Sequence, residues 1–199
     1  MILTCYRGRN TDLIQKVSQL YFPGGAKIAD VTYGNGWFWK KIDLSQYEFY
    51  PSDIKTGVDF RSTPYPDNYF DVVVFDPPYT HGGSESFVFS HKYNNAALNG
   101  VNHKHVMELY AAGMEECKRI LKPKGLLLVK CQDEVAGGSN KWSHIEIYQI
   151  AMNFGLQSKD LFILHSECQP LNRHKNRPQL HARKNHSYLW IFRKKFKTA

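Results

Sequence analysis

The segment DVVVFDPPYT, residues 71–80, places an acid, two prolines and a tyrosine directly after an apolar run. Because proline has no backbone N–H, a strand formed by the apolar residues must end at this point. The Asp76 carboxylate can then accept one N–H of a planar amine, and the freed Pro77 carbonyl can accept a second. Pro78 stiffens the loop, and the Tyr79 ring can stack on the aromatic ring that carries the amine. This combination predicts recognition of an aromatic amine at the end of a strand.

The segment DVTYGNG, residues 30–36, is a second candidate for ligand binding. Asp30 ends an expected strand, and Gly34 and Gly36 allow a tight turn whose backbone approaches a ligand closely. Strand-to-helix turns that bind nothing also use glycine, so a purely structural turn is the alternative. Trp39 stands where the dinucleotide-binding fingerprint needs its third glycine, which argues against a nicotinamide-dependent dehydrogenase.

Asp53 ends a second expected strand, and Asp59 is a further acid that follows it. An acid at the end of that strand commonly binds ribose hydroxyls in nucleoside-binding doubly wound folds, which is the role we expect for Asp53. A solvated turn aspartate is the alternative. Asp59 is expected near the same edge of the sheet.

DPPY following DVTYGNG resembles the class I S-adenosylmethionine-dependent amino-methyltransferases, which include DNA adenine-N6 and cytosine-N4 methyltransferases. The resemblance covers most of the chain, including RILKPKGLLLVKC at 119–131 and HARKNHSYLWIFRK at 181–194. It implies S-adenosylmethionine as cofactor, no metal, and methyl transfer to adenine N6 in DNA. The catalytic residues that it implies are Asp76, Pro77, Pro78 and Tyr79, and the cofactor-binding residues are Asp30, Thr32, Gly34, Gly36, Asp53 and Asp59.

The chain departs from this family's pattern in two respects. Thr32 stands where the family usually has a phenylalanine after the acid, and we expect no separate target-recognition domain. The loops at 80–102 and 168–185 are therefore expected to face the substrate. Methylation of RNA adenine or of cytosine N4 in DNA remains an alternative, as does a catalytically silent nucleic-acid-binding module. The intact Asp30, Gly36 and Asp76 argue against the silent module.

The apolar periodicity predicts the elements that position these residues. Helices are expected at 10–21, capped by Asn10 or Thr11, near Trp37, after Asn102 and at 142–155. Strands are expected at 26–31, 47–53, 69–75, 126–131, 160–166 and 186–192. This alternation predicts a single α/β domain over residues 1–199. Its fold would be a doubly wound, Rossmann-like sheet, mostly parallel, with an antiparallel C-terminal edge hairpin. Ligands bind such sheets beyond the carboxyl ends of the strands, so the two motifs should face one cleft.

Basic residues are concentrated near the carboxyl terminus. The formal net charge is +8, and from Cys168 onward the chain has nine Lys or Arg residues and no Asp or Glu. Such a field favours polyanions, of which nucleic acid is the commonest, although a solvated basic tail is the alternative. The candidate phosphate contacts are Arg173, Lys175, Arg177, Arg183 and Lys184.

Several patterns narrow the class of protein. The sequence has no apolar run long enough to span a membrane, and its four cysteines form no C-x-x-C pair, which predicts reduced thiols in a cytoplasmic protein. His103 and His105 indicate a polar helix start rather than a metal site. Lys130, at the end of an apolar strand, either lines the cleft or caps the strand. The sequence indicates no oligomeric state.

Overall fold

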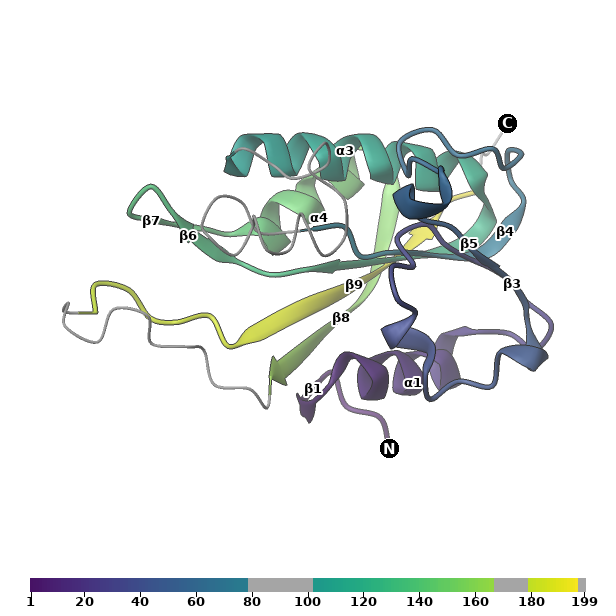
Figure 1. Ribbon diagram of the computed structural model, residues 1–199, viewed down its shortest axis with the longest axis horizontal. Helices are drawn as coiled ribbons and strands as arrows, with labels where there is room; N and C mark the ends of the chain where they lie inside the picture. Colours follow the sequence, from purple (N-terminus) through teal and green to yellow (C-terminus); the bar gives the residue numbers. More distant parts are fainter. Residues whose placement is uncertain (79–101, 167–178, 197–199) are drawn as a thin grey trace.

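Seven strands form one sheet in the order β1-β8-β9-β5-β4-β2-β3, with helices packed on both of its faces (Figure 1). The computed structural model describes residues 1–78, 102–166 and 179–196. The predicted α/β fold, with a mostly parallel sheet and an antiparallel C-terminal hairpin, is confirmed. No helix in these three ranges is long and apolar enough to cross a membrane.

The parallel half of the sheet carries both sequence motifs. It consists of β2 (Lys27–Asp30), β3 (Glu48–Pro51), β4 (Phe70–Phe75) and β5 (Leu121–Cys131). The Val72–Val74 run of β4 is fully buried, because β4 lies between β2 and β5 and both of its faces are covered. Since the four strands are parallel, Asp30 and Asp76 both leave the sheet at the same edge.

The last two strands pair as an antiparallel hairpin, but this hairpin is not the edge of the sheet. β8 (Leu156–Ser166) and β9 (His186–Lys194) pair antiparallel, and β9 inserts between β8 and β5. An additional strand, β1 (Cys5–Gly8), pairs parallel with β8 and forms the edge instead. The short sequence CYRG has no apolar alternation, so periodicity did not predict it.

Three predicted helices are confirmed: α1 (Asn10–Tyr21), α3 (His103–Ile120) and α4 (Ser143–Asn153). The predicted cap of α1 is wrong, because Arg9 is the N-cap and its N–H donates to the Asp12 carboxylate at 3.0 Å. Three short 3₁₀ turns complete the first half of the chain: η1 (Trp37–Trp39), η2 (Leu44–Gln46) and η3 (Ile54–Thr56).

The helix predicted near Trp37 is also wrong, since η1 is a single 3₁₀ turn. The turn begins at Gly36, whose backbone is left-handed, and the Trp39 indole is directed inward, where it packs on Phe49 with ring centroids 4.6 Å apart. This contact and a hydrogen bond to Asp30 fix Trp39, the last residue of the turn, so the 3₁₀ turn does not continue into a longer helix.

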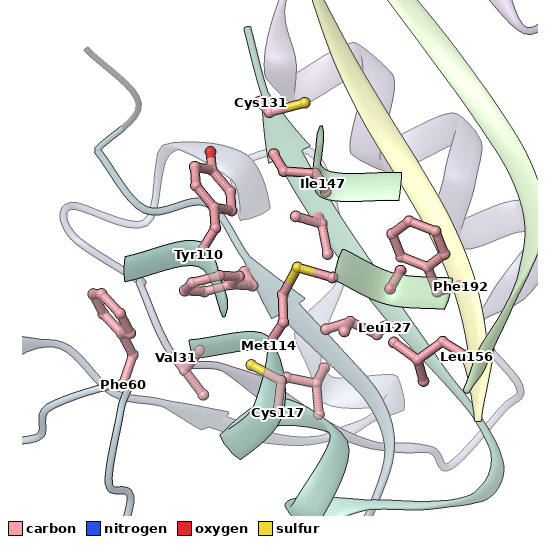
Figure 2. Packing of buried hydrophobic residues seen from close by; sticks show 14 of the residues in the cluster. Val31, Phe60, Tyr110, Met114, Cys117, Leu127, Cys131, Ile147, Leu156 and Phe192 are labelled. Atoms are coloured by element: carbon pink, nitrogen blue, oxygen red, sulfur yellow. The ribbon is translucent and has the colours of Figure 1, made fainter. Parts of the chain in front are cut away.

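Two apolar layers enclose the sheet. Under α3 and α4 the layer includes Tyr110 and Met114 (Figure 2) together with Phe75, and under α1 it includes Ile14 and Val74. The ring of Phe75 approaches α3 so closely that a side chain on the helix at Gly113 would collide with it. This packing fixes the end of β4, and therefore the position at which Asp76 leaves the sheet.

A two-stranded hairpin, β6 (Glu134–Ala136) and β7 (Ser139–Lys141), follows β5. In Figure 1 this hairpin and the chain leading into β9 extend from the same end of the sheet.

Candidate active site

The glycine turn after β2 has a conformation that requires glycine. Gly34 has φ 55° and Gly36 has φ 67°, both in the left-handed region. A Cβ atom at Gly36 would also collide with the Tyr33 hydroxyl group. The turn is therefore sterically defined before any ligand is considered.

Hydrogen bonds attach this turn to the end of β3. The Tyr33 N–H donates to the Ser52 carbonyl at 3.1 Å, and the Gly34 N–H donates to Asp53 Oδ2 at 3.0 Å. Asp53 Oδ1 accepts the Lys55 N–H at 3.0 Å. Each carboxylate oxygen can accept more than one hydrogen bond, so Asp53 retains acceptor capacity next to the glycines. The structure thus places Asp53 beside the glycine turn.

Asp30 is a buried acid that two donors hold in place. Its side chain is 3 % exposed; Oδ2 accepts the Trp39 Nε1–H at 2.7 Å, and Oδ1 accepts the Thr32 N–H at 3.0 Å. Burial raises the pKa of Asp30 to about 7, with a further contribution from the neighbouring carboxyl of Asp76. The bond from Trp39 was not predicted from the sequence, although a buried indole N–H needs an acceptor.

Thr32 joins the glycine turn to the DPPY segment. Its Oγ1 accepts the Asp76 N–H at 2.7 Å and lies 3.4 Å from Asp30 Oδ1, to which its hydroxyl hydrogen can donate. One hydroxyl group thus connects the acid that ends β2 to the acid that follows β4. The threonine that departs from the family pattern is the residue that makes this link.

Asp76 has a carboxylate oxygen with no protein partner among the described residues. Oδ1 is buried and accepts no hydrogen bond there, although the residue as a whole is only partly buried. Burial raises the pKa of Asp76 to about 6, while the charge of Lys130 opposes the increase. A buried acceptor left without a donor is costly and is a candidate contact for a ligand.

Lys130 lies beside Asp76 on the neighbouring strand. β4 and β5 pair in a register that matches Phe75 with Val129, so the next residues along each chain are neighbours. Lys130 is fully buried; its burial lowers the pKa of its ammonium group, and the charge of Asp76 opposes that decrease. Lys130 therefore lies inside the sheet next to the candidate site and does not form a solvated strand cap.

The remaining predicted residues are placed differently. Pro77 is buried and Pro78 partly exposed after Asp76, whereas Tyr79, Arg173, Lys175, Arg177 and most of both predicted substrate-facing loops lie outside the described residues. The Asp59 carboxylate accepts the backbone N–H of Arg61 at 2.9 Å and its Nε–H at 3.0 Å. An adenine amine would have to compete with these donors for Asp59.

Arg183 and Lys184 lie at the same end of the sheet as Asp76. They precede β9, and the Gln132 side chain, just beyond β5, donates to the carbonyl oxygens of Lys184 at 3.4 Å and His186 at 3.0 Å. β9 then runs antiparallel to β5, so Arg193, Lys194 and Lys195 lie at the opposite end. The described members of the basic cluster are therefore divided between the two ends of β9.

The raised pKa values of Asp30 and Asp76 predict a pH-dependent change well above the usual range for aspartate. Carbon-13 NMR of the aspartate carboxyl groups should detect two groups that titrate near pH 7 and pH 6. Asp76→Asn removes a negative neighbour and should therefore lower the pKa of Asp30. Because the folded pKa values exceed the usual aspartate value of 3.8, the stabilisation linked to these protons is complete below about pH 3.8 and is lost as pH rises from there through 6 and 7. The wild-type Tm should fall over that interval.

The matched control is Asp43→Asn, which removes an exposed acid that caps η2. It should leave the pKa of Asp30 unchanged. Titration of all aspartates near pH 4, or an unchanged Asp30 in the Asp76→Asn protein, would contradict the assignment of a coupled pair of buried acids.

Searches against protein-family models and against curated proteins found no match. Solved structures that resemble the chain include an S-adenosylmethionine-dependent methyltransferase from Methanosarcina mazei (10% identity, 91% of this chain and 98% of that one, TM-score 0.51). The [4+2]-cyclase SpnF is also similar (14% identity, 93% and 80%, TM-score 0.57). A third is a provisionally assigned DNA modification methylase from Thermus thermophilus, solved with S-adenosyl-L-methionine (20% identity, 71% of this chain, TM-score 0.49). The chain spans 55% of the length of that third protein. The fold is thus the Rossmann-like fold of S-adenosylmethionine-dependent methyltransferases.

Proposed function

We propose that this protein transfers a methyl group from S-adenosylmethionine to the exocyclic amine of a nucleobase, with adenine N6 in DNA as the favoured acceptor. The observation that carries the proposal is the arrangement of two acids around Thr32: Asp30 borders the glycine turn, and Asp76 presents a buried oxygen without a donor among the described residues. The first feature suits a cofactor, and the second suits an amine.

The residues of the glycine turn fit the proposed cofactor. Gly34 and Gly36 adopt the left-handed backbone that forms the turn, and Asp53 has the remaining acceptor capacity to bind ribose hydroxyl groups. Asp30 would hold the turn in its shape and provide negative charge near the methionine part. Asp59 fits less well, because Arg61 already donates to its carboxylate.

Asp76 would act on the acceptor amine. When bound, S-adenosylmethionine supplies an electrophilic methyl group. The nitrogen lone pair of adenine is delocalised into its ring, so the amine attacks poorly unless hydrogen bonds to Asp76 and the Pro77 carbonyl localise that pair. With a pKa of about 6, Asp76 is mostly ionised near pH 8 and can stabilise the positive charge that develops on the nitrogen. Holding the two reactants in line provides much of the acceleration.

An adenine in duplex DNA would have to leave the base stack to reach Asp76, and an adenine in RNA or a cytosine could use the same carboxylate. These acceptors share one chemistry and differ only in the product, so the identity of the methylated nucleoside distinguishes them.

Incubation with tritium-labelled S-adenosylmethionine and separate DNA and RNA pools, followed by nucleoside analysis, tests the proposal. We expect label in N6-methyladenine of DNA. Asp76→Ala should abolish transfer, because the amine loses its acceptor, whereas Asp43→Ala should retain it. Label only in RNA, or only in N4-methylcytosine, would replace the favoured acceptor. Full turnover by the Asp76→Ala protein would exclude the proposed site.

Thr32 should contribute to turnover through its hydroxyl group. Thr32→Val keeps the side-chain shape but removes the acceptor of the Asp76 N–H, so we expect kcat to fall by about 10- to 100-fold, the effect of losing one buried hydrogen bond. Thr32→Ser keeps the hydroxyl and should remain within a few-fold of wild type. Steady-state kinetics, together with the Kd for the cofactor, would measure both. Equal kcat values for the valine and serine variants would show that the bond does not position Asp76.

A further inference from the structure

An aromatic and basic surface lies at the same end of the sheet as the candidate site, and we call it the hairpin platform: Val135, Lys141, Trp142, Arg183 and Lys184. Trp142, which follows β7, is 47% exposed, and Val135 in β6 is 41% exposed. The Lys184 ammonium lies 4.7 Å from the centroid of the Trp142 ring. An exposed indole with a cation over its face can stack on a ligand ring, which makes Trp142 a candidate contact for a partner.

The platform is fixed to the strand that neighbours Asp76. Gln132, just beyond the end of β5, holds the backbone of Lys184. On the other side, Asp133 accepts His144 Nδ1–H at 2.7 Å and the Tyr188 hydroxyl at 3.2 Å, and the rings of His144 and Tyr188 stack 4.2 Å apart. These bonds fix the start of α4, and hence Trp142, to β5 and β9.

The acidic side chains around the platform are paired with histidines. Asp133 contacts His144, while His103 contacts both Glu134 and Glu146 with N···O distances of 2.8 Å. The segment that carries Arg183 and Lys184 contains no acid. The charge held against the Trp142 ring is the positive charge of the Lys184 ammonium.

We propose that the hairpin platform binds an unpaired strand of nucleic acid, with a base stacked on Trp142 and the neighbouring phosphates bound by Arg183 and Lys184. An indole face can stack on a base only where that base is not enclosed in a duplex, and such stacking is independent of sequence. Lysine and arginine beside the ring match the phosphate charge. The inference rests on the proposed function and extends it, because it specifies a single-stranded or locally unpaired substrate.

The opposite end of β9 offers a matched control. β9 has nine residues, so Arg193 and Lys195 lie about 30 Å from Arg183 and Lys184 along the strand. The double variants Arg183→Ala/Lys184→Ala and Arg193→Ala/Lys195→Ala change the net charge by the same amount at the two ends. A difference in nucleic-acid binding between the two double variants therefore depends on where the charges lie and not on the overall charge.

Fluorescence anisotropy with a labelled single-stranded oligonucleotide and with its duplex, without a methyl donor, tests the platform. We expect Arg183→Ala/Lys184→Ala to weaken single-strand binding at least 10-fold and to reduce the salt slope by roughly 1.4, the value for two phosphate contacts. Arg193→Ala/Lys195→Ala should remain within 2-fold of wild type. Trp142→Ala should weaken single-strand binding about 5- to 100-fold, corresponding to one stacked base, and affect the duplex less. Trp142→Phe should keep most of the affinity.

Equal effects of the two double variants would overturn the platform, as would single-strand binding that is unchanged in the Trp142→Ala protein. If the Trp142→Ala protein does not fold, unchanged single-strand binding by the Arg183→Ala/Lys184→Ala protein would also overturn the proposed platform. If wild type methylates nucleic acid while the platform variants bind normally, the platform is wrong and the proposed function stands. If single strands bind through Trp142 but no methyl transfer occurs, the proposed function fails and the platform stands.

Discussion

The hydrogen bond from the Asp76 N–H to Thr32 Oγ1 is the contact on which the candidate site depends. It joins the turn that follows β2 to the segment that follows β4. The same hydroxyl group also lies 3.4 Å from Asp30 Oδ1, so it links Asp30 to Asp76. Neither acid is positioned by its own strand alone, because each lies where regular strand pairing ends. The shared hydroxyl gives the two halves of the site one geometry.

Burying two carboxyl groups at one edge has a cost that the fold offsets locally. Asp30 receives two N–H donors, from Trp39 and Thr32. Among the described residues, Asp76 has the charge of Lys130 beside it and a buried Oδ1 without a donor. Burial consequently raises both pKa values, and the two groups ionise less readily than exposed aspartates. A ligand that donates a hydrogen bond to such a buried acid would stabilise its ionised form. An exocyclic amine can donate in this way.

The fold could be predicted from the alternation of strands and helices in the sequence. The position of Asp76 at a strand end could be predicted because Pro77 stops a buried apolar run, which is a local signal. The link through Thr32 was not predictable, since it requires that β2 and β4 be neighbours whose ends are level. Periodicity also failed at Trp37, where the tertiary bond of Trp39 to Asp30 replaces a helix with a 3₁₀ turn. The position of Lys130 at the end of an apolar strand could be predicted from the sequence. That it neighbours Asp76 follows only from the register of β4 and β5.

If the glycine turn binds the cofactor and Asp76 binds the acceptor amine, calorimetric titration of S-adenosylmethionine into three proteins should separate the two roles. Wild type and Asp76→Ala should bind with Kd values within a few-fold of each other. Gly36→Val should lose binding, because its side chain would meet Tyr33 and the backbone there is left-handed. Failure of wild type to bind, or equal binding by all three proteins, would contradict the account.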